Sequence, residues 1–160
     1  MKAFLLVLTS LFLVANADAT NLLKPTNKVE SWRLEQVDGG KAEIKADDES
    51  VSVLVSAVDS TNWHVQLVQS DLDLKDGVTY TLKFKARSPE SVSISINAMI
   101  DQEDWHEIGL HEDLYLTKEY KDYSYDFTAN GTTSKKNRIS FVLGNDKGLT
   151  QIKDVTLVAK

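Results

Sequence analysis

Two histidines that flank an acidic residue, His106 and His111 around Glu107, come closest in this sequence to a catalytic metal motif. Zinc proteases place two histidines four residues apart on one face of a helix, with a glutamate as general base. Here the histidines are five residues apart, Gly109 lies between them, and the surrounding residues have no helical period. The spacing therefore argues against a zinc site.

Carboxylates are plentiful around the same histidines, and a pair of them could hydrolyse a glycosidic bond. That reaction needs an acid and a base at a fixed separation, and nothing in the sequence singles out such a pair. The sequence also lacks a nucleophile elbow and a phosphate-binding glycine loop. It contains no cysteine, which excludes thiol nucleophiles and zinc–thiolate sites. We therefore predict a protein that is not an enzyme. The carboxylates concerned are Asp101, Glu103, Asp104, Glu107, Glu112 and Asp113.

The formal net charge of the chain is −6, and its basic residues form no cluster. Nucleic acids and anionic membranes attract concentrated positive charge. We therefore expect neither a nucleic acid nor a membrane as the partner.

Residues 1–19 have the pattern of a secretory signal peptide. Lys2 is followed by an apolar run over 3–15, and Ala17 and Ala19 provide small residues for cleavage. The apolar run is too short to cross a bilayer. We predict a secreted or periplasmic protein in which residues 20–160 form one domain.

The remaining residues have the two-residue alternation of half-buried strands, most clearly over 78–87. Asp76-Gly77 provides the turn into that strand. The segment 101–116 is less regular and predicts a loop with a short strand. No stretch has a convincing helical period, so we predict an all-β antiparallel sandwich or barrel of about nine strands. The predicted strands are 32–35, 42–46, 51–57, 63–67, 78–87, 92–99, 123–127, 138–143 and 155–159.

Seven short motifs follow one another along residues 21–160. They are NLL at 21–23, SWRLE at 31–35, NWHVQLVQ at 62–69, the spaced set Leu74, Gly77 and Tyr80 to Leu82, the Tyr-x-Tyr-x-Phe-Thr run at 123–128, ISFVLGN at 139–145 and IKDVTL at 152–157. In order and spacing this set resembles the carbohydrate-binding modules of the family 4/9/22 type, which have a galactose-binding-like jelly-roll fold.

The resemblance implies a jelly-roll β-sandwich that binds β-glucan or xylan on the concave face of one sheet. It also implies glycoside hydrolases that act on the same polymer as possible partners, although this chain would be a free-standing module. Strand residues of outward parity, together with one tryptophan in the irregular segment, then become the candidate carbohydrate-binding residues. These are Arg33, Glu35, His64, Gln66, Asn97, Trp105 and Arg138.

These residue types suit a sugar ring, which has an apolar C–H face and a rim of hydroxyls. Stacking on one indole buries about 100 Å², worth roughly 2.5 kcal/mol. Because association itself costs ~4–15 kcal/mol, we expect weak, micromolar to millimolar binding. Trp105 lies among charged residues and is the preferred stacking residue. Trp32 has the parity of a core residue, and Trp63 is expected in the core with some exposure.

One departure from the family concerns a structural calcium ion. The resemblance implies Asp-Asp-Val in the last strand, where the first aspartate helps to hold the ion, but this chain has Lys153-Asp154-Val155. Parity places Lys153 inward with Val155. We therefore predict no cofactor and hypothesise that the Lys153 amine takes the position of the calcium.

The sequence thus predicts an exported, non-catalytic module that binds polysaccharide. The alternative is a structural or adhesive surface protein that uses the same sandwich to contact another protein. A large continuous apolar patch on the concave face would favour adhesion, whereas a polar face with exposed aromatic rings would favour sugar.

Overall fold

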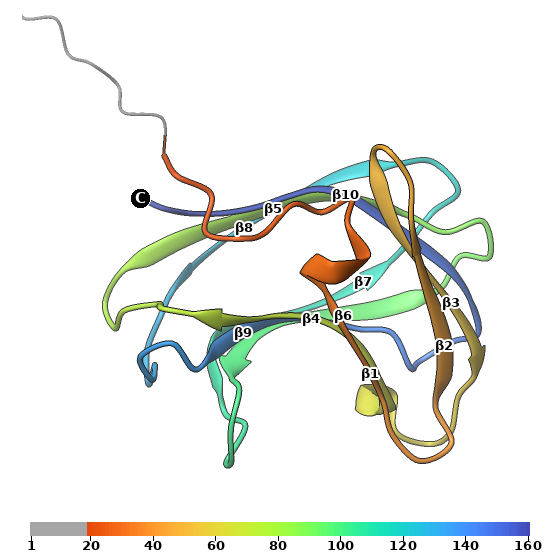
Figure 1. Ribbon diagram of the computed structural model, residues 1–160, viewed down its shortest axis with the longest axis horizontal. Helices are drawn as coiled ribbons and strands as arrows, with labels where there is room; N and C mark the ends of the chain where they lie inside the picture. Colours follow the sequence, from red (N-terminus) through yellow and green to blue (C-terminus); the bar gives the residue numbers. More distant parts are fainter. Residues whose placement is uncertain (1–18) are drawn as a thin grey trace, which may run out of the picture.

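The computed structural model describes residues 19–160 (Figure 1). The predicted signal peptide, 1–19, lies outside the described residues except for Ala19. The described residues form ten strands and two short 3₁₀ helices, and neither helix is long and apolar enough to cross a membrane. In chain order the elements are η1 (Val29–Ser31), β1 (Arg33–Gln36), β2 (Lys41–Ala46), β3 (Ser50–Ala57), η2 (Asn62–His64), β4 (Val65–Leu72), β5 (Thr79–Arg87), β6 (Ser93–Ile100), β7 (Glu107–Tyr115), β8 (Lys121–Thr128), β9 (Asn137–Val142) and β10 (Gly148–Ala159).

The strands form two five-stranded antiparallel sheets that lie face to face. Sheet A has the order β1-β4-β9-β6-β7, and sheet B has the order β2-β3-β10-β5-β8. In Figure 1, β5, β8 and β10 form the upper layer, and β4, β6 and β9 form the lower layer. Most neighbouring strands are distant in the chain, as a jelly roll requires. The prediction of an all-β antiparallel sandwich is confirmed.

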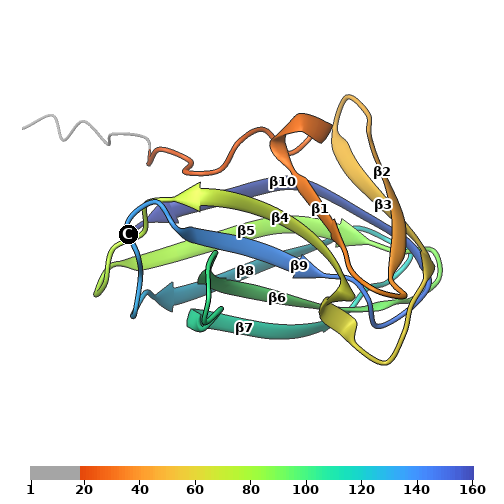
Figure 2. The same cartoon turned by 60° about the horizontal axis from the view of Figure 1, so that its bottom comes forward.

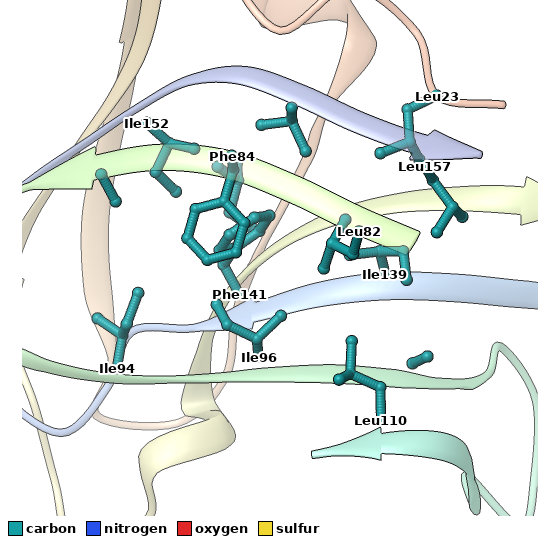
Figure 3. Packing of buried hydrophobic residues seen from close by; sticks show 14 of the residues in the cluster. Leu23, Leu82, Phe84, Ile94, Ile96, Leu110, Ile139, Phe141, Ile152 and Leu157 are labelled. Atoms are coloured by element: carbon teal, nitrogen blue, oxygen red, sulfur yellow. The ribbon is translucent and has the colours of Figure 1, made fainter. Parts of the chain in front are cut away.

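The hydrophobic core fills the space between the two sheets (Figure 3). Phe84 of β5 packs edge-on against Phe141 of β9, with ring centroids 5.2 Å apart, so the two sheets meet through these rings. Trp32 packs edge-on against Phe141 at 5.9 Å, and its indole N–H donates to the Thr26 carbonyl at 2.9 Å. The predicted core role of Trp32 is confirmed.

Strand β7 is the element that differs most from the sequence prediction. The sequence predicts a loop with a short strand over 101–116, whereas Glu107–Tyr115 forms a nine-residue strand at the edge of sheet A. Two residues interrupt its apolar alternation. Gly109 has a φ of +124°, and a Cβ there would lie 2.5 Å from the Thr128 carbonyl oxygen. Glu112 pairs with Ile96 and therefore occupies an inward position.

Strand β10 is also longer than predicted, and it contains a bulge that changes the parity of Lys153. The strand spans Gly148–Ala159, and its pairing with β5 shifts register between Lys153 and Thr156, where Asp154 has a φ of +55°. Ile152 and Val155 are both buried in the core, so the bulge turns Lys153 outward. The prediction that Lys153 points inward is wrong because the sequence does not reveal the bulge.

Candidate functional site

The outward-facing surface of sheet A carries most of the predicted site residues, and we call it the outer face of sheet A. Strand register places Ser140 of β9 between Val68 of β4 and Asn97 of β6. Val68 in turn lies opposite Arg33 of β1, and Asn97 lies opposite His111 of β7. These five residues form a row that crosses the whole sheet. Figure 2 shows β4, β9, β6 and β7 running side by side across this surface.

The centre of the outer face is recessed beneath longer side chains. Val68, Ser140 and Val142 alternate with core residues and therefore point outward, yet each is at most 3% exposed. Val68 and Val142 also lie outside the hydrophobic core cluster. Their burial therefore comes from longer side chains around them on the outer face, and the small residues form its floor.

Arg138 is the centre of a charged cluster on this face. The residue is only 3% exposed, and its Nη1 donates to both oxygens of the Glu35 carboxylate at 3.2 Å and to Asp101 at 3.4 Å. Its Nη2 lies 3.4 Å from Gln66 Oε1. Arg33 binds the same two carboxylates, at 2.7 Å from Asp101 and 2.8 Å from Glu35. The two guanidinium groups and two carboxylates thus fix each other in place.

The pKa values of Arg33 and Asp101 move in the directions that keep both side chains charged. The hydrogen bond to Asp101 raises the pKa of Arg33, with a further contribution from Glu35. Burial alone would raise the pKa of Asp101, but the hydrogen bond from Arg33 and the positive charges of Arg33 and Arg138 outweigh it, so the pKa lies below its ordinary value. Arg33 and Asp101 therefore form a stable ion pair rather than a pair of groups poised to exchange protons.

Trp105 borders the cluster from the loop between β6 and β7. Its side chain is 48% exposed, and the Arg138 guanidinium carbon lies 5.1 Å from the ring centroid, a cation–π contact. The backbone of Trp105 has a φ of +62° and donates to the Gln102 carbonyl at 2.7 Å. The indole is thus held against the cluster while half of its surface remains open to a ligand.

Three polar atoms buried on this face have no hydrogen-bond partner in the protein. They are Asn97 Oδ1, Ser140 Oγ and Arg138 Nε, and across residues 19–160 the only other buried side-chain atom of this kind is the Tyr123 hydroxyl. Asn97 and Ser140 are paired in register, and Arg138 lies two residues before Ser140 in the same strand. Since buried polar groups in folded proteins are almost always hydrogen-bonded, these three atoms mark the floor of this face as a place where the protein leaves polar groups without partners of its own.

His64 does not join the predicted group. The sequence places it on a strand with outward parity, whereas the structure places it in η2, immediately before β4, where its side chain is buried. Its Nδ1 lies 2.6 Å from Asp59, and its Nε2 lies 3.6 Å from Asp38. The strand begins at Val65, two residues later than predicted, and His64 joins two loops instead of lining the outer face.

Strand β7 adds polar residues that the sequence prediction does not include. His111 bonds to Glu107 and lies 3.6 Å from Asp113, whose carboxylate accepts a hydrogen bond from Ser95 at 2.7 Å. The sequence does contain one sign of this strand, which is the alternation of Ile108 and Leu110 with polar residues. The inward Glu112 breaks that pattern, which is why the segment resembles a loop.

Comparison with known families identifies the chain. The carbohydrate-binding module 4/9 family, described as "Carbohydrate binding domain", matches residues 13–148. The chain belongs to this carbohydrate-binding family. A search of curated proteins finds no significant match.

Solved structures with the same fold include several carbohydrate-binding modules. One, described as "CBM4 structure and function", superposes with a TM-score of 0.73 at 22% identity and covers 81% of this chain and 86% of its own. The N-terminal cellulose-binding domain of β-1,4-glucanase C from Cellulomonas fimi gives 0.65 at 21% identity, covering 84% and 91%. The family 11 module from Clostridium thermocellum, solved with a β-1,3-1,4-linked tetrasaccharide, gives 0.59 at 14% identity, covering 86% and 94%. These likenesses establish the jelly-roll fold of the module.

A second indole, that of Trp63, is exposed at the other end of sheet A in this module. The ring is 50% exposed and packs edge-on against His64, with centroids 4.3 Å apart. The Trp63 carbonyl accepts a hydrogen bond from Gln66 Nε2 at 2.9 Å. The expectation of a core residue with some exposure therefore understates how open Trp63 is.

The two histidines that resemble a zinc motif are held separately in the module. His106 lies in the loop before β7 and bonds to Asp104 and to the Gly131 carbonyl, whereas His111 lies within β7 and bonds to Glu107. Within residues 19–160 no three His, Cys, Asp or Glu side chains are grouped to hold a metal ion. The histidines therefore act as hydrogen-bonding groups in this structure.

Proposed function

We propose that this module binds neutral polysaccharide chains of the β-glucan or xylan type on the outer face of sheet A. The observation that carries the proposal is the half-exposed Trp105 indole, held by its cation–π contact with Arg138 beside a cluster of charged groups. The indole of Trp105 offers a flat surface to the C–H face of a sugar ring. Sugar hydroxyls both donate and accept, so they can bond to the partly exposed side chains of Arg33, Glu35 and Asn97 on the same face.

Two solved relatives support this class of ligand. The Cellulomonas fimi domain is a cellulose-binding domain, and the Clostridium thermocellum module was solved with a β-1,3-1,4-mixed-linked tetrasaccharide. Both share the fold of this chain.

The charges on the outer face favour a neutral polymer over an acidic one. The face carries two guanidinium groups and four carboxylates, which lie on β1, β9, β7 and the loop before β7. The sum of these charges is negative, so the face repels uronate groups. The guanidinium groups are those of Arg33 and Arg138, and the carboxylates are those of Glu35, Asp101, Glu107 and Asp113.

Affinity electrophoresis tests the proposal directly. We expect gels that contain a soluble β-glucan or xylan to retard the module, with a Kd of roughly micromolar to millimolar. Gels that contain a polyuronate should leave its migration unchanged. The proposal would be contradicted if the module migrated equally fast in gels with β-glucan, with xylan, with mannan and with no polysaccharide. Stronger retardation by the polyuronate would contradict the charge argument.

The rival role in protein adhesion receives less support from the same face. Adhesion favours a large continuous apolar patch, but the apolar floor residues Val68 and Val142 are buried and offer no such patch.

As further parts of the proposal, the module is exported, it acts without catalysis of its own, and its partners are glycoside hydrolases that act on the same polymer. Incubation with glucan or xylan should therefore release no soluble product.

Lys153 forms part of the proposal because its ammonium group lies among oxygen donors of the kind that hold a calcium ion. They line a surface pocket of about 450 Å³ formed by Thr26, Asn27, Asp48, Glu49, Lys153 and Asp154. The Lys153 ammonium lies 3.2 Å from Glu49 and 4.6 Å from the centre of the Tyr120 ring. The Thr26 hydroxyl already accepts from the Val155 N–H at 2.9 Å. In our proposal the lysine supplies the positive charge that calcium would supply, from an outward rather than an inward position.

Calcium should therefore have no effect on the stability of the natural chain. We expect the melting temperature, measured by differential scanning calorimetry, to be the same in calcium and in chelator. The Lys153→Asp variant should have a lower melting temperature than the natural chain in chelator. Calcium should restore part of that difference, since a ligand at 100 times its Kd adds about 2.7 kcal/mol of stability. Lys153→Met serves as the control that removes the amine without adding a carboxylate. Stabilisation of the natural chain by calcium, reversed by chelator, would contradict this part of the proposal.

A further inference from the structure

His106, the residue after Trp105, joins the loop that carries this tryptophan to a second loop. Its Nδ1 lies 2.6 Å from the Asp104 carboxylate in its own loop. Its Nε2 lies 2.6 Å from the carbonyl oxygen of Gly131, in the loop between β8 and β9. A Cβ on Gly131 would lie 2.9 Å from that Nε2, so only glycine permits this approach without displacement.

Both partners of the His106 ring are acceptors. A carbonyl oxygen and an ionised carboxylate have no proton to donate, and a neutral imidazole carries only one N–H. Both short hydrogen bonds can therefore form together only when the ring is protonated on both nitrogens. A neutral ring turns one of the two contacts into a repulsion between lone pairs.

The charges around the ring act in the same direction. The hydrogen bond with Asp104, followed by that with Gly131, raises the pKa of His106 above its ordinary value near 6.5. Asp76, from the loop between β4 and β5, adds a further negative charge, and its carboxylate accepts from the Thr132 N–H at 2.8 Å. The acidic groups that face the ring thus come from its own loop and from the β4–β5 loop, and the β8–β9 loop contributes a carbonyl.

The bond from His106 to Gly131 is one of two bonds that hold the Trp105 loop to the β8–β9 loop. The other joins the Asp101 N–H to the Lys136 carbonyl at 2.6 Å. Within its own loop, the Trp105 N–H donates to Gln102, and the His106 carbonyl accepts from Ile100 at 3.0 Å. Losing the His106 bond leaves the outer part of the loop attached through its own turn and through the contact of the indole with Arg138.

We propose that protonated His106 is a positioning residue for Trp105, so that the module binds its polysaccharide more tightly in mildly acidic than in alkaline solution. This inference rests on the proposed function, in which Trp105 stacks on a sugar ring. The sign follows from the ring chemistry. We call the two hydrogen bonds of the His106 ring, to Asp104 and to Gly131, the clip. The clip is complete below the ordinary histidine pKa, and it is lost as the pH rises through the higher pKa of His106 in the folded protein.

The experiment measures affinity by isothermal titration calorimetry with a soluble β-glucan or xylan oligosaccharide, from about pH 5 to about pH 9. We expect the natural chain to lose affinity by roughly tenfold across this range, as for one charge-assisted hydrogen bond. His106→Gln should bind weakly at every pH, with a flat profile. His111→Gln separates the two histidines of this region: because His111 lies on the proposed binding face, the variant can change the affinity itself, but it should keep the pH slope of the natural chain.

A second readout needs no ligand. The ¹⁵N shifts of the His106 ring report its protonation, and the indole N–H signal of Trp105 should shift with the same midpoint in the natural chain but not in His106→Gln. If no polysaccharide binds at any pH, the proposed function fails while this readout still tests the clip. If the polysaccharide binds with a flat pH profile, or if His106→Gln keeps the slope, the clip is wrong and the proposed function stands. Loss of the slope in His111→Gln would assign it to the other histidine and overturn the inference.

Discussion

Replacing Arg138 with methionine is expected to lower the melting temperature by about 10 °C, because it leaves a buried site with unbalanced carboxylates. Removing one partner of a buried ion pair costs ~3–5 kcal/mol, and each kcal/mol is worth about 3 °C in a domain of this size. Arg138 is 3% exposed and bonds to both Glu35 and Asp101. Thermal unfolding followed by circular dichroism measures the effect.

Two further variants separate this charge effect from a simple loss of volume. Arg33→Met removes the more exposed guanidinium of the same cluster, so it should cost about 1 kcal/mol or less. The double variant Arg138→Met with Glu35→Gln removes one of the stranded charges and should recover part of the lost stability. A melting temperature of Arg138→Met within about 2 °C of the natural chain would contradict the central role of this residue.

Replacing Trp105 with alanine is expected to weaken polysaccharide binding by about thirtyfold, which corresponds to about 2 kcal/mol. The indole is 48% exposed, so its loss removes a stacking surface without opening a cavity in the core. The melting temperature should therefore stay nearly unchanged while the affinity falls. Isothermal titration calorimetry with an oligosaccharide of the polymer that retards the natural chain provides the measurement.

The matched control for Trp105 lies on the opposite sheet. Leu54 of β3 is 47% exposed, and its neighbours Val53 and Val55 are buried in the core, so it points outward from sheet B. Leu54→Ala should bind polysaccharide as the natural chain does. Unchanged affinity of Trp105→Ala would remove that residue from the site, and a loss of affinity in Leu54→Ala would move the site to sheet B.

The sequence predicts the strands best where each one has a single buried face. The alternation over 78–87 corresponds to β5, Thr79–Arg87, within one residue. It predicts β7 and β10 poorly because each contains a local exception, the inward Glu112 in one and the bulge at Asp154 in the other. Both exceptions depend on neighbouring strands, so a short window of sequence does not contain them.

The candidate site follows the same division between local and long-range information. Outward parity correctly places Arg33, Glu35, Gln66 and Asn97 on one surface, because parity is a property of each strand alone. The role of Asp101 is invisible in the sequence, since this loop residue bridges arginines 68 and 37 positions away. His64 is misplaced for a related reason, because β4 begins two residues later than predicted and leaves His64 in η2, where strand parity does not apply.

The position of β10 has a consequence for how this chain acquires its structure. The last strand of the sequence is the middle strand of sheet B, between β3 and β5, and near the start of the domain the Leu22 N–H bonds to the Leu157 carbonyl at 2.8 Å. Without the residues of β10, the β2-β3 pair and the β5-β8 pair are not joined to each other within sheet B. Sheet B therefore forms only once this strand is present, and the many pairings between remote segments should make folding slow, on the order of milliseconds to seconds.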